Sequence, residues 1–437
     1  MKSTSRGHAM FAVGRLFRAF AMAGLIIAST MMARAADVSA AMMEAIDSGG
    51  APAERSISII SPGVYKAVVT QRTGGGISQL FDLQNDPQAK QNLAFADRGL
   101  LEIGWHGAQY KVAASTQPAY DGCADWPSSG HNDLKATGDL QVIEQSPARI
   151  RVRVKSEFVW WSKQVHTDFT VSGIYTFYPA GRIISQVTVQ NNGEKPFHWS
   201  SEYGPHLMIS SAQTANPSGE PMGFGTPAHP EWKGADKAEE LTMAYPTSAA
   251  VKAGLMITIP AEQQALFTRH MRHGPAGQLG WDRAGYGSNG IVMDKGYQST
   301  WACMIQLGAA GSSLLPEFKA PADGLGVAAD YRKPARITGA EVVTDDPGDF
   351  NKDGFNESEG CYVLKGPGPL SFAFAGNEGS AGLAPVFKIK GWTGEAPKVM
   401  SVNGKDMLAA AAVVDGSLLI ELLGSIGADR VEVKVGK

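Results

Sequence analysis

Hydrophobic and polar residues alternate along most of this chain in short segments, as a β-strand with one buried face requires. The clearest segment is 150–155, where Ile, Val and Val alternate with Arg, Arg and Lys. Tight turns are predicted at Tyr178-Pro-Ala-Gly181 and Asn191-Asn-Gly193. The pattern predicts an antiparallel, all-β chain. Its clearest strands cover residues 64–71, 150–158, 169–178, 182–190, 255–259 and 301–307.

Helical periodicity is scarce: a short helix is predicted over 40–48 and a helical turn over 235–240. The composition changes near residues 320–340, where Pro and Gly indicate a linker. Beyond it, short strands are predicted over residues 362–364, 370–374, 386–389, 399–402, 418–423 and 430–435. We therefore expect a large antiparallel β domain over 56–330 and a small β-sandwich over 331–437.

The first 35 residues predict a secretory signal peptide that is cleaved after Ala35. A basic start precedes an apolar run over 19–32, and Ala33-Arg34-Ala35 has the small-x-small cleavage pattern. The apolar run is too short for a membrane span, and no later run reaches about 18 apolar residues. With residues 36–55 as a linker, the mature chain is expected in a periplasm or outside the cell, without a membrane span.

Charge and cysteine content narrow the expected partners. Without the signal peptide the chain has 34 basic and 42 acidic side chains, a net charge of −8, which disfavours a nucleic-acid partner.

Cys123, Cys303 and Cys361 lie far apart and lack metal-site spacing. Export permits one disulfide among them, and buried free cysteines are the alternative.

The segment 349–360 has the spacing of an EF-hand-type calcium loop. Oxygen-bearing side chains alternate, and Gly354 at the sixth position permits the sharp turn. The twelfth position is Gly360, so Glu359 or a remote residue must complete the shell. A solvated acidic turn is the alternative. The sequence predicts a structural Ca²⁺ ion held by Asp349, Asn351, Asp353, the Phe355 carbonyl, Glu357 and Glu359.

Several segments of the larger domain resemble the galactose-mutarotase-like supersandwich proteins, which include aldose epimerases and polysaccharide lyases. They are the Gly-rich stretch 73–80 with 91–93, and the aromatic-Pro-x-Gly-Arg hairpin 173–183 that leads into 187–192. The resemblance covers residues 56–330. It implies a supersandwich, a large twisted double sheet with a concave groove, and an oligosaccharide or polysaccharide ligand. Fold resemblance alone assigns no reaction.

The segment 197–206 contains the first group of candidate site residues. In a regular strand, even positions from 198 to 202 share one face and odd positions from 199 to 203 the other. The resemblance implies a catalytic histidine here, which matches His206. Glu202 and Tyr203 are further catalytic candidates, and His198 is a substrate-binding candidate. Ordinary strand residues with satisfied hydrogen bonds are the alternative.

A second group has Arg269 and Arg272 as catalytic candidates and His270, His273 and Trp281 as substrate-binding candidates. Arginines can bind the carboxylates of acidic sugars through paired hydrogen bonds, and a tryptophan can stack on a sugar ring. Neighbouring glycines suggest loops at a groove rim. The alternative is a solvated basic loop.

Two further candidates are a tryptophan pair and one glutamate. Trp160 and Trp161 are adjacent, so only one of them can face the core of a strand; the other is a sugar-stacking candidate or is covered by a loop. The resemblance implies a late catalytic glutamate, for which Glu317 is the candidate.

The leading hypothesis is a polysaccharide lyase that acts on a uronate-containing glycan by β-elimination. Arg269 or Arg272 neutralises the carboxylate, and His206 and Tyr203 serve as base and acid. An aldose mutarotase or epimerase would use His206 and Glu317. A glycoside hydrolase is a further alternative, although no acid pair has a recognisable spacing. The last alternative is a non-catalytic carbohydrate-binding protein.

Overall fold

The structure is a computed structural model, and its strands confirm that the chain is all-β. The described part contains two short 3-10 segments, η1 (Gln71–Thr73) and η3 (Ala261–Leu266), and none of its helices is long and apolar enough to cross a membrane. The structure describes residues 43–50, 55–84, 86–94, 99–109, 122–126, 139–159, 165–210, 242–248, 253–266, 268–272, 276–284, 291–307, 334–376, 382–426 and 429–436.

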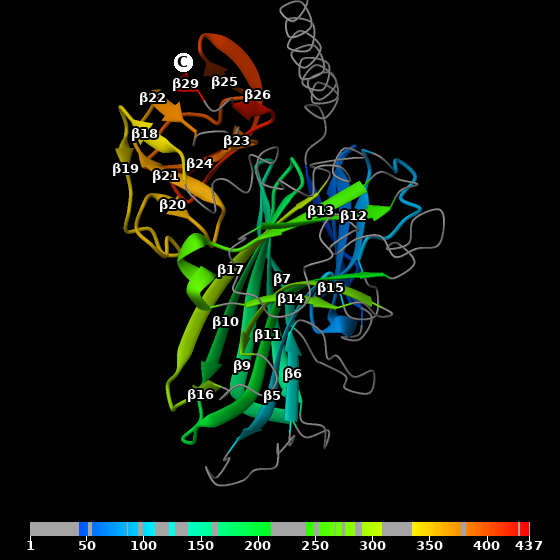
Figure 1. The fold of residues 1–437 in the computed structure, drawn as a ribbon. Coiled ribbons are helices and arrows are strands. Elements are labelled where there is room, and N and C mark those ends of the chain that lie inside the picture. Colours follow the sequence, from blue (N-terminus) through cyan, green and yellow to red (C-terminus); the bar gives the residue numbers. More distant parts are fainter. Residues whose placement is uncertain are drawn as a thin grey trace, which may run out of the picture.

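Strands β1–β17 form a large unit of three antiparallel sheets (Figure 1). The first sheet consists of β1 (Glu44–Asp47), β2 (Ser56–Ser61), β3 (Tyr65–Thr70) and β4 (Gly76–Asp82). The second has the order β12 (Thr242–Ser248), β13 (Ala253–Thr258), β17 (Gln298–Leu307), β10 (Arg182–Asn191), β9 (Val165–Phe177), β8 (Ile150–Val159) and β7 (Asp139–Gln145). The third has the order β14 (Thr268–Arg272), β15 (Ala276–Ala284), β11 (Phe197–Ser210), β5 (Leu101–Gln109) and β6 (Gly122–Trp126), and β16 (Ile291–Met293) also pairs with β11.

One hydrophobic core joins these three sheets. Alternate residues of β2 and β8, such as Ile57 and Val152, are fully buried in it, as the hydrophobic pattern predicts. Phe197 and Trp199 of β11 stack on each other with ring centroids 5.6 Å apart. Gly75, at φ +94°, touches β8 so closely that a Cβ would lie 2.0 Å from Val154 Cγ1. The Gly-rich stretch after β3 is therefore a tight turn that packs on the second sheet.

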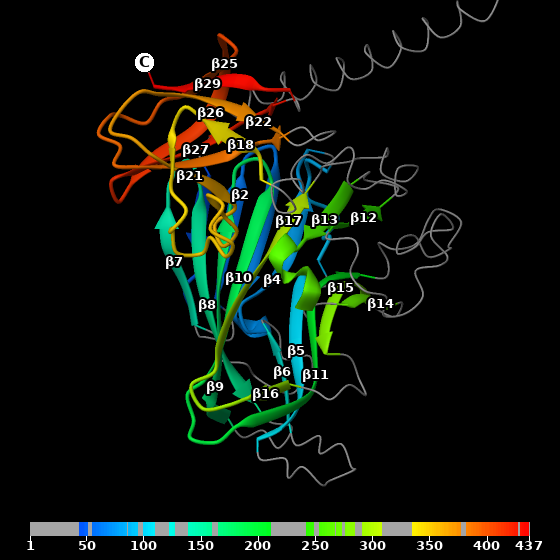
Figure 2. The ribbon, with the colours of Figure 1, turned by 60° about the vertical axis from the view of Figure 1, so that its left-hand side comes forward.

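Strands β18–β29 form a C-terminal unit whose strands pair only with one another among the described residues. It contains β18 (Arg336–Thr338), β19 (Glu341–Val342), β20 (Phe355–Asn356), β21 (Cys361–Lys365), β22 (Leu370–Ala375), β23 (Gly382–Leu383), β24 (Val386–Lys390), β25 (Val399–Val402), β26 (Lys405–Val414), β27 (Ser417–Leu422), β28 (Ser425–Ile426) and β29 (Val431–Val435). β26 pairs with β25 through its first residues and with β27 through its last, so it joins two layers. Figure 2 shows this unit at one end of the long strands β7–β10.

Two predictions of secondary structure are wrong. The helix expected over 40–48 is contradicted by β1, whose residues Glu44–Asp47 pair with β2. Alanine, methionine and glutamate favour a helix in isolation, but pairing at the sheet edge overrides that preference. The sequence prediction also omits β26, because its alanine run 409–412 lacks the β-branched residues typical of strands. The helical turn predicted over 235–240 and the signal peptide lie outside the described residues.

A buried ion-pair network joins the two units. Arg149, which precedes β8 and is 5% exposed, donates to Glu144 at 2.8 and 2.9 Å. Its third nitrogen, Nη1, donates to Glu359 of the C-terminal unit at 2.6 Å. Lys388 of β24 donates to the other oxygen of Glu359 at 3.1 Å. The Tyr178 hydroxyl donates to the Glu359 carbonyl oxygen, which also fixes the backbone there.

Apolar contacts surround this network. Ile184 and Met304, on β10 and β17 of the large unit, belong to the second hydrophobic core together with Cys361 of β21. Cys303 and Cys361 are both free and buried, so these two do not form a disulfide. The junction thus combines buried ion pairs with apolar contacts between the two units.

Glu421 of β27 is a second buried carboxyl group at the junction. It is 0% exposed, and its Oε2 accepts a hydrogen bond from the Ala180 amide at 3.1 Å. Its Oε1 has no hydrogen-bond partner among the described residues. Burial raises the pKa of Glu421 to about 8, although the Arg182 charge opposes this shift.

We predict that Arg149→Ala destabilises the protein by about 3–5 kcal/mol, because it leaves Glu359 buried and short of its closest partner. Arg153→Ala is the matched control, since Arg153 is exposed and, among the described residues, donates a hydrogen bond to Gln141 alone. Urea unfolding of both variants measures the difference in free energy. Equal losses in the two variants would show that the junction does not depend on Arg149.

We predict that Glu421→Gln stabilises the protein at high pH. Between its ordinary pKa of 4.5 and about 8, the unfolded chain loses this proton and the folded chain keeps it, so parent stability falls as pH rises. Glutamine does not ionise, so the stability advantage of the variant should reach on the order of 5 kcal/mol above pH 8 and nearly vanish at about pH 4. Melting temperatures at the two pH values measure it; an advantage independent of pH contradicts the assignment.

Candidate functional site

The third sheet brings together candidate residues that are far apart in the sequence. β11 contains His198, Glu202, Tyr203 and His206, and it lies between β15 and β5. β15 in turn pairs with β14, which contains Arg269, His270 and Arg272. The two groups predicted from the sequence therefore belong to neighbouring strands of one sheet.

The backbone register places specific positions opposite one another. His206 is paired with Gly280 of β15 on one side and with Glu102 of β5 on the other. Gly280 is paired with His270 of β14, so His270, His206 and Glu102 lie in one cross-strand row. Paired positions are the nearest cross-strand neighbours in an antiparallel sheet. Glu102 is not among the residues predicted from the sequence, because its proximity to His206 depends entirely on this pairing.

The next positions along the strands extend this group. Arg269 is paired with Trp281, and Tyr203 is paired with Asp282. Asp282 is also paired with Thr268. Thr268, Asp282 and Tyr203 therefore form a second cross-strand row, two positions along β15 from the row that contains Gly280.

An irregularity in β11 separates Tyr203 from His206. Both of its pairings shift register there, so Gly204 and Pro205 together oppose Trp281 of β15. Gly204 has a φ of +102°, which favours glycine, and Pro205 has no amide hydrogen to leave unpaired. Bulges of this kind re-aim side chains near functional sites.

A second shift, between Trp199 and Ser201, interrupts the pairing with β5. The regular pairing of β11 with β5 is therefore interrupted at Ser200, within the segment that the sequence predicts as a regular strand. The alternation holds at its start: Phe197 and Trp199 are buried in the core, and His198 between them is half-buried.

Four candidates lie outside the described residues: Trp160, Trp161, His273 and Glu317. They remain predictions from the sequence.

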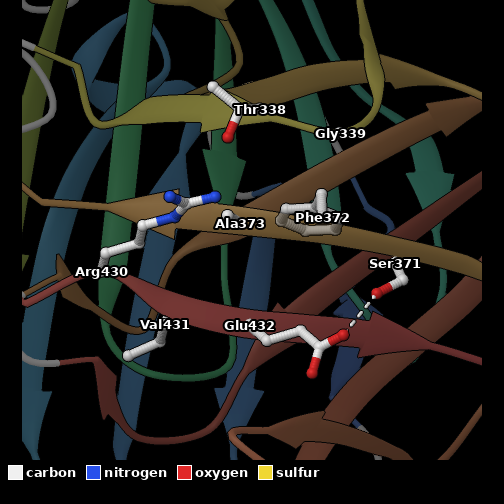
Figure 3. Close-up of a pocket in the computed structure, with 8 residues that line it drawn as sticks. All are labelled: Thr338, Gly339, Ser371, Phe372, Ala373, Arg430, Val431 and Glu432. Carbon is white, nitrogen blue, oxygen red and sulfur yellow. Dashed lines mark hydrogen bonds between the residues drawn. The ribbon is translucent and has the colours of Figure 1, made fainter.

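A hollow of about 440 Å³ lies on the surface of the C-terminal unit (Figure 3). Strands β18, β22 and β29 contribute to it, and its described lining residues include none of the site residues predicted from the sequence. Its lining residues are Thr338, Gly339, Ser371, Phe372, Ala373, Arg430, Val431 and Glu432.

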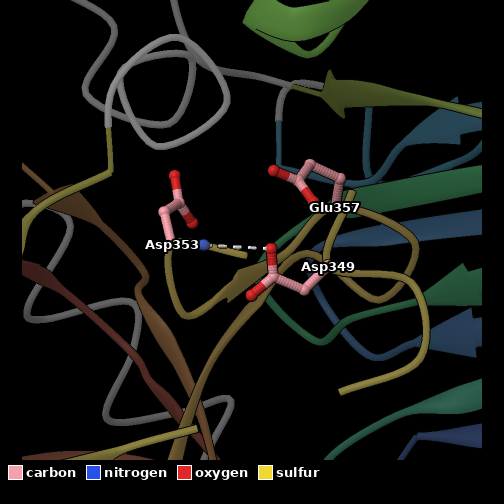
Figure 4. Close-up of side chains that lie close together, drawn as sticks. All are labelled: Asp349, Asp353 and Glu357. Atoms are coloured by element: carbon pink, nitrogen blue, oxygen red, sulfur yellow. Dashed lines mark hydrogen bonds between the residues drawn. The ribbon is translucent and has the colours of Figure 1, made fainter. Parts of the chain in front are cut away.

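The predicted calcium loop contains a compact group of carboxylates. Asp349, Asp353 and Glu357 each offer an oxygen, and these oxygens lie within 4.8 Å of one another (Figure 4). Asp349 and Glu357 are buried and Asp353 is exposed. All the donors in this group are hard carboxylate oxygens, which suits a cation such as Ca²⁺.

Backbone amides shape the loop around these oxygens. Asp349 accepts hydrogen bonds from the amides of Lys352 at 2.7 Å and Gly354 at 2.8 Å, and Asn351 accepts one from the Asp353 amide at 3.0 Å. Gly354 has a φ of +94°, and a Cβ there would lie 2.1 Å from Val342 Cγ1. Only glycine fits this position, as the motif predicts.

A fourth carboxylate, Glu262 of η3, comes from the large unit. Its Oε2 accepts a hydrogen bond from Asn351 Nδ2 at 3.3 Å. Burial raises the pKa of Glu357 to about 9, and the charges of Glu262 and Asp353 add to this shift. The like charges thus favour a bound proton or cation within the group. The sequence around the loop does not predict the role of Glu262, because η3 is distant in the sequence and reaches the loop only in the folded chain.

The structure does not bring Glu359 to this group, contrary to its predicted role as a ligand. Glu359 pairs with Arg149 and Lys388 instead. Burial opposes ionisation, but the charges of Arg149 and Lys388 outweigh it and lower the pKa of Glu359 to about 2. The next residue, Gly360, has a φ of +69° and approaches Ile184 so closely that a Cβ would lie 2.6 Å from its Cδ1. Contact between the units therefore explains why the twelfth loop position is glycine.

Comparison with known proteins gives only distant matches. No family model matches the chain, and no curated protein sequence matches it. A TPR-domain containing protein from Parabacteroides distasonis is 10% identical, with a TM-score of 0.36, over 58% of this chain and 47% of its own. A putative aldose 1-epimerase from Klebsiella pneumoniae is 11% identical, with a TM-score of 0.37, over 65% of this chain and 88% of its own.

A heparan sulfate lyase from Pedobacter heparinus is also similar, at 9% identity and a TM-score of 0.30, over 78% of this chain and 40% of its own. The chain thus spans less than half the length of the TPR-domain protein and of this lyase. Structural neighbours therefore include both an epimerase and a lyase, and at these scores they assign no activity to the chain.

Proposed function

We propose that the protein is an exported polysaccharide lyase that cleaves a uronate-containing glycan by β-elimination. The observation that carries the proposal is the backbone register of the third sheet. It places His206 of β11, His270 of β14 and the Arg269–Trp281 pair on three consecutive strands, with His206 and His270 both paired with Gly280 of β15. A cation and an imidazole base are groups that such a reaction needs, and an aromatic ring can stack on the sugar.

The proposed reaction uses these groups in three roles. Arg269 or Arg272 binds the uronate carboxylate and stabilises the negative charge that develops on it. His206 removes the proton from the carbon next to the carboxylate, and the electron pair forms a carbon–carbon double bond. The bond to the glycosidic oxygen breaks, and Tyr203 donates a proton to that oxygen. One product therefore carries an unsaturated uronate, and no water is consumed.

Two features of the sequence support this proposal. The Gly-rich stretch 73–80 and the hairpin 173–183 resemble galactose-mutarotase-like proteins, which implies a carbohydrate ligand. The predicted signal peptide favours a substrate outside the cytoplasm, where glycan polymers occur.

A sugar epimerase is the second candidate, and Glu102 is the observation that favours it. Epimerisation or mutarotation needs an acid and a base on one sugar ring, and Glu102 is paired directly with His206. Such an enzyme would interconvert free sugars without forming an unsaturated product.

We predict that the mature chain produces an ultraviolet-absorbing unsaturated product from at least one uronate polymer. His206→Ala should lower kcat by about 10²–10⁴-fold, because it removes the base. His166→Ala is the control, since His166 lies on β9 of the second sheet and has no role in the proposed reaction. A polymer panel that gives no absorbance rise contradicts the lyase proposal, and mutarotation lost in Glu102→Gln would favour the epimerase.

We also propose that a structural Ca²⁺ ion stabilises the loop and its contact with η3. Asp349, Asp353 and Glu357 are the proposed ligands, with Glu262 as an additional carboxylate from the large unit. The ion would neutralise like charges that are otherwise held close together, and it would take no part in the elimination.

We predict that calcium raises the melting temperature of the full chain. Binding at 100 times the dissociation constant adds about 2.7 kcal/mol to stability, so the shift should be several degrees. Glu262→Gln should reduce this shift. Glu194→Gln, which removes an exposed carboxylate of the same unit, should leave it unchanged. A melting temperature that does not respond to calcium or to a chelator rules out the ion as a structural element.

A further inference from the structure

The surface hollow of the C-terminal unit lies on the outward face of a sheet. Residues of β29 alternate between buried and exposed, and Glu432 is on the exposed face. Thr338, Ala373 and Glu432 are paired across β18, β22 and β29, so they form one row on that face. Phe372, the neighbour of Ala373, is buried in the core beneath the hollow.

Small residues at its centre and long ones at its sides explain why the surface is hollow here. Ala373 occupies the middle of the row, and Gly339 follows β18 at a φ of +91°. Figure 3 shows the Arg430 guanidinium above Ala373 on one side, and Glu432 with Ser371 on the other. The hollow therefore has a guanidinium and a carboxylate on opposite sides of an apolar centre.

The charges of this face favour an anion. Arg430 has no ion pair or hydrogen bond among the described residues, whereas Glu432 already bonds Ser371 at 3.1 Å and Lys434 at 3.3 Å. Arg336 is also exposed, two positions before Thr338 on β18. Arg336, Arg430 and Lys434 thus accompany Glu432 on this face, and Asp429, which precedes Arg430, adds a second carboxylate, so positive charge exceeds negative charge here on a protein whose formal net charge is −3. A local excess of positive charge attracts anionic ligands.

The polar groups of the hollow suit a ligand that is hydroxylated as well as anionic. A guanidinium binds a carboxylate through two parallel hydrogen bonds. The Thr338 and Ser371 hydroxyls can donate or accept, and the Glu432 carboxylate accepts from sugar hydroxyls. We propose that this hollow is an accessory binding site for a carboxylated sugar unit, which Arg430 anchors by its carboxylate. The choice of a sugar acid rests on the proposed function.

The site would hold a glycan without cleaving it. Its described lining residues include neither a histidine nor a tyrosine, so they lack the proton-transfer groups proposed for the third sheet. A second, non-catalytic contact raises the effective concentration of a polymer near the enzyme.

Calorimetric titration of the full mature chain tests this site. The His206→Ala background keeps the ligand intact, and uronate tetrasaccharides and a neutral tetrasaccharide are the probes. We expect two uronate sites per chain and no binding of the neutral sugar at the hollow. Arg430→Gln should remove or weaken one site at least tenfold, and Ala373→Phe should do the same by filling the hollow.

Lys155→Gln, which removes an exposed cation from β8, is the matched control and should retain both sites. Arg430 is exposed, so its variant should fold normally, and an unchanged melting temperature checks this. Binding that Arg430→Gln and Ala373→Phe leave unchanged overturns the proposal, as does the absence of any uronate binding. Arg430-dependent binding by a parent chain that cleaves no uronate polymer would instead retain this site and reject the proposed lyase.

Discussion

The arrangement of this protein depends on the buried ion pair between Arg149 and Glu359. Removing two charges from water costs several kcal/mol for each ion, so such a pair stabilises a fold only when its other hydrogen-bonding capacity is satisfied. Glu144 and Lys388 provide those additional partners, one from each side of the junction. The pair therefore has one favourable geometry, and this geometry fixes how the C-terminal unit meets the large unit.

Fixing Glu359 also fixes the loop that precedes it. The loop enters the junction at Gly360, where contact with Ile184 leaves no room for a side chain. One end of the loop is thus neutralised by arginine and lysine, whereas its middle gathers like charges at Asp349, Asp353 and Glu357. Carboxylates a few residues apart consequently have opposite pKa shifts, and only the uncompensated group is suited to a cation.

The sequence predicted correctly those elements whose structure depends mainly on neighbouring residues. The alternation over 150–155 predicted β8, because each residue's exposure follows the pleat, and the spacing from Asp349 to Gly354 predicted a turn that gathers oxygens. The helix prediction over 40–48 was wrong, and the alanine-rich strand β26 was not predicted. In both segments, pairing with partner strands rather than intrinsic propensity determines the structure. Glu102 and Glu262 could not be found from the sequence, because strand pairing and packing between the units place them.

The proposed function requires that β11, β14 and β15 together bind a uronate glycan. Amide hydrogen exchange of the His206→Ala variant, with and without a saturating uronate oligosaccharide, tests this claim most directly. The account predicts slower exchange over 201–207, 268–272 and 278–283, the segments that contain the paired candidate residues. Unchanged exchange in all three segments, in a sample that demonstrably binds the oligosaccharide, would contradict it.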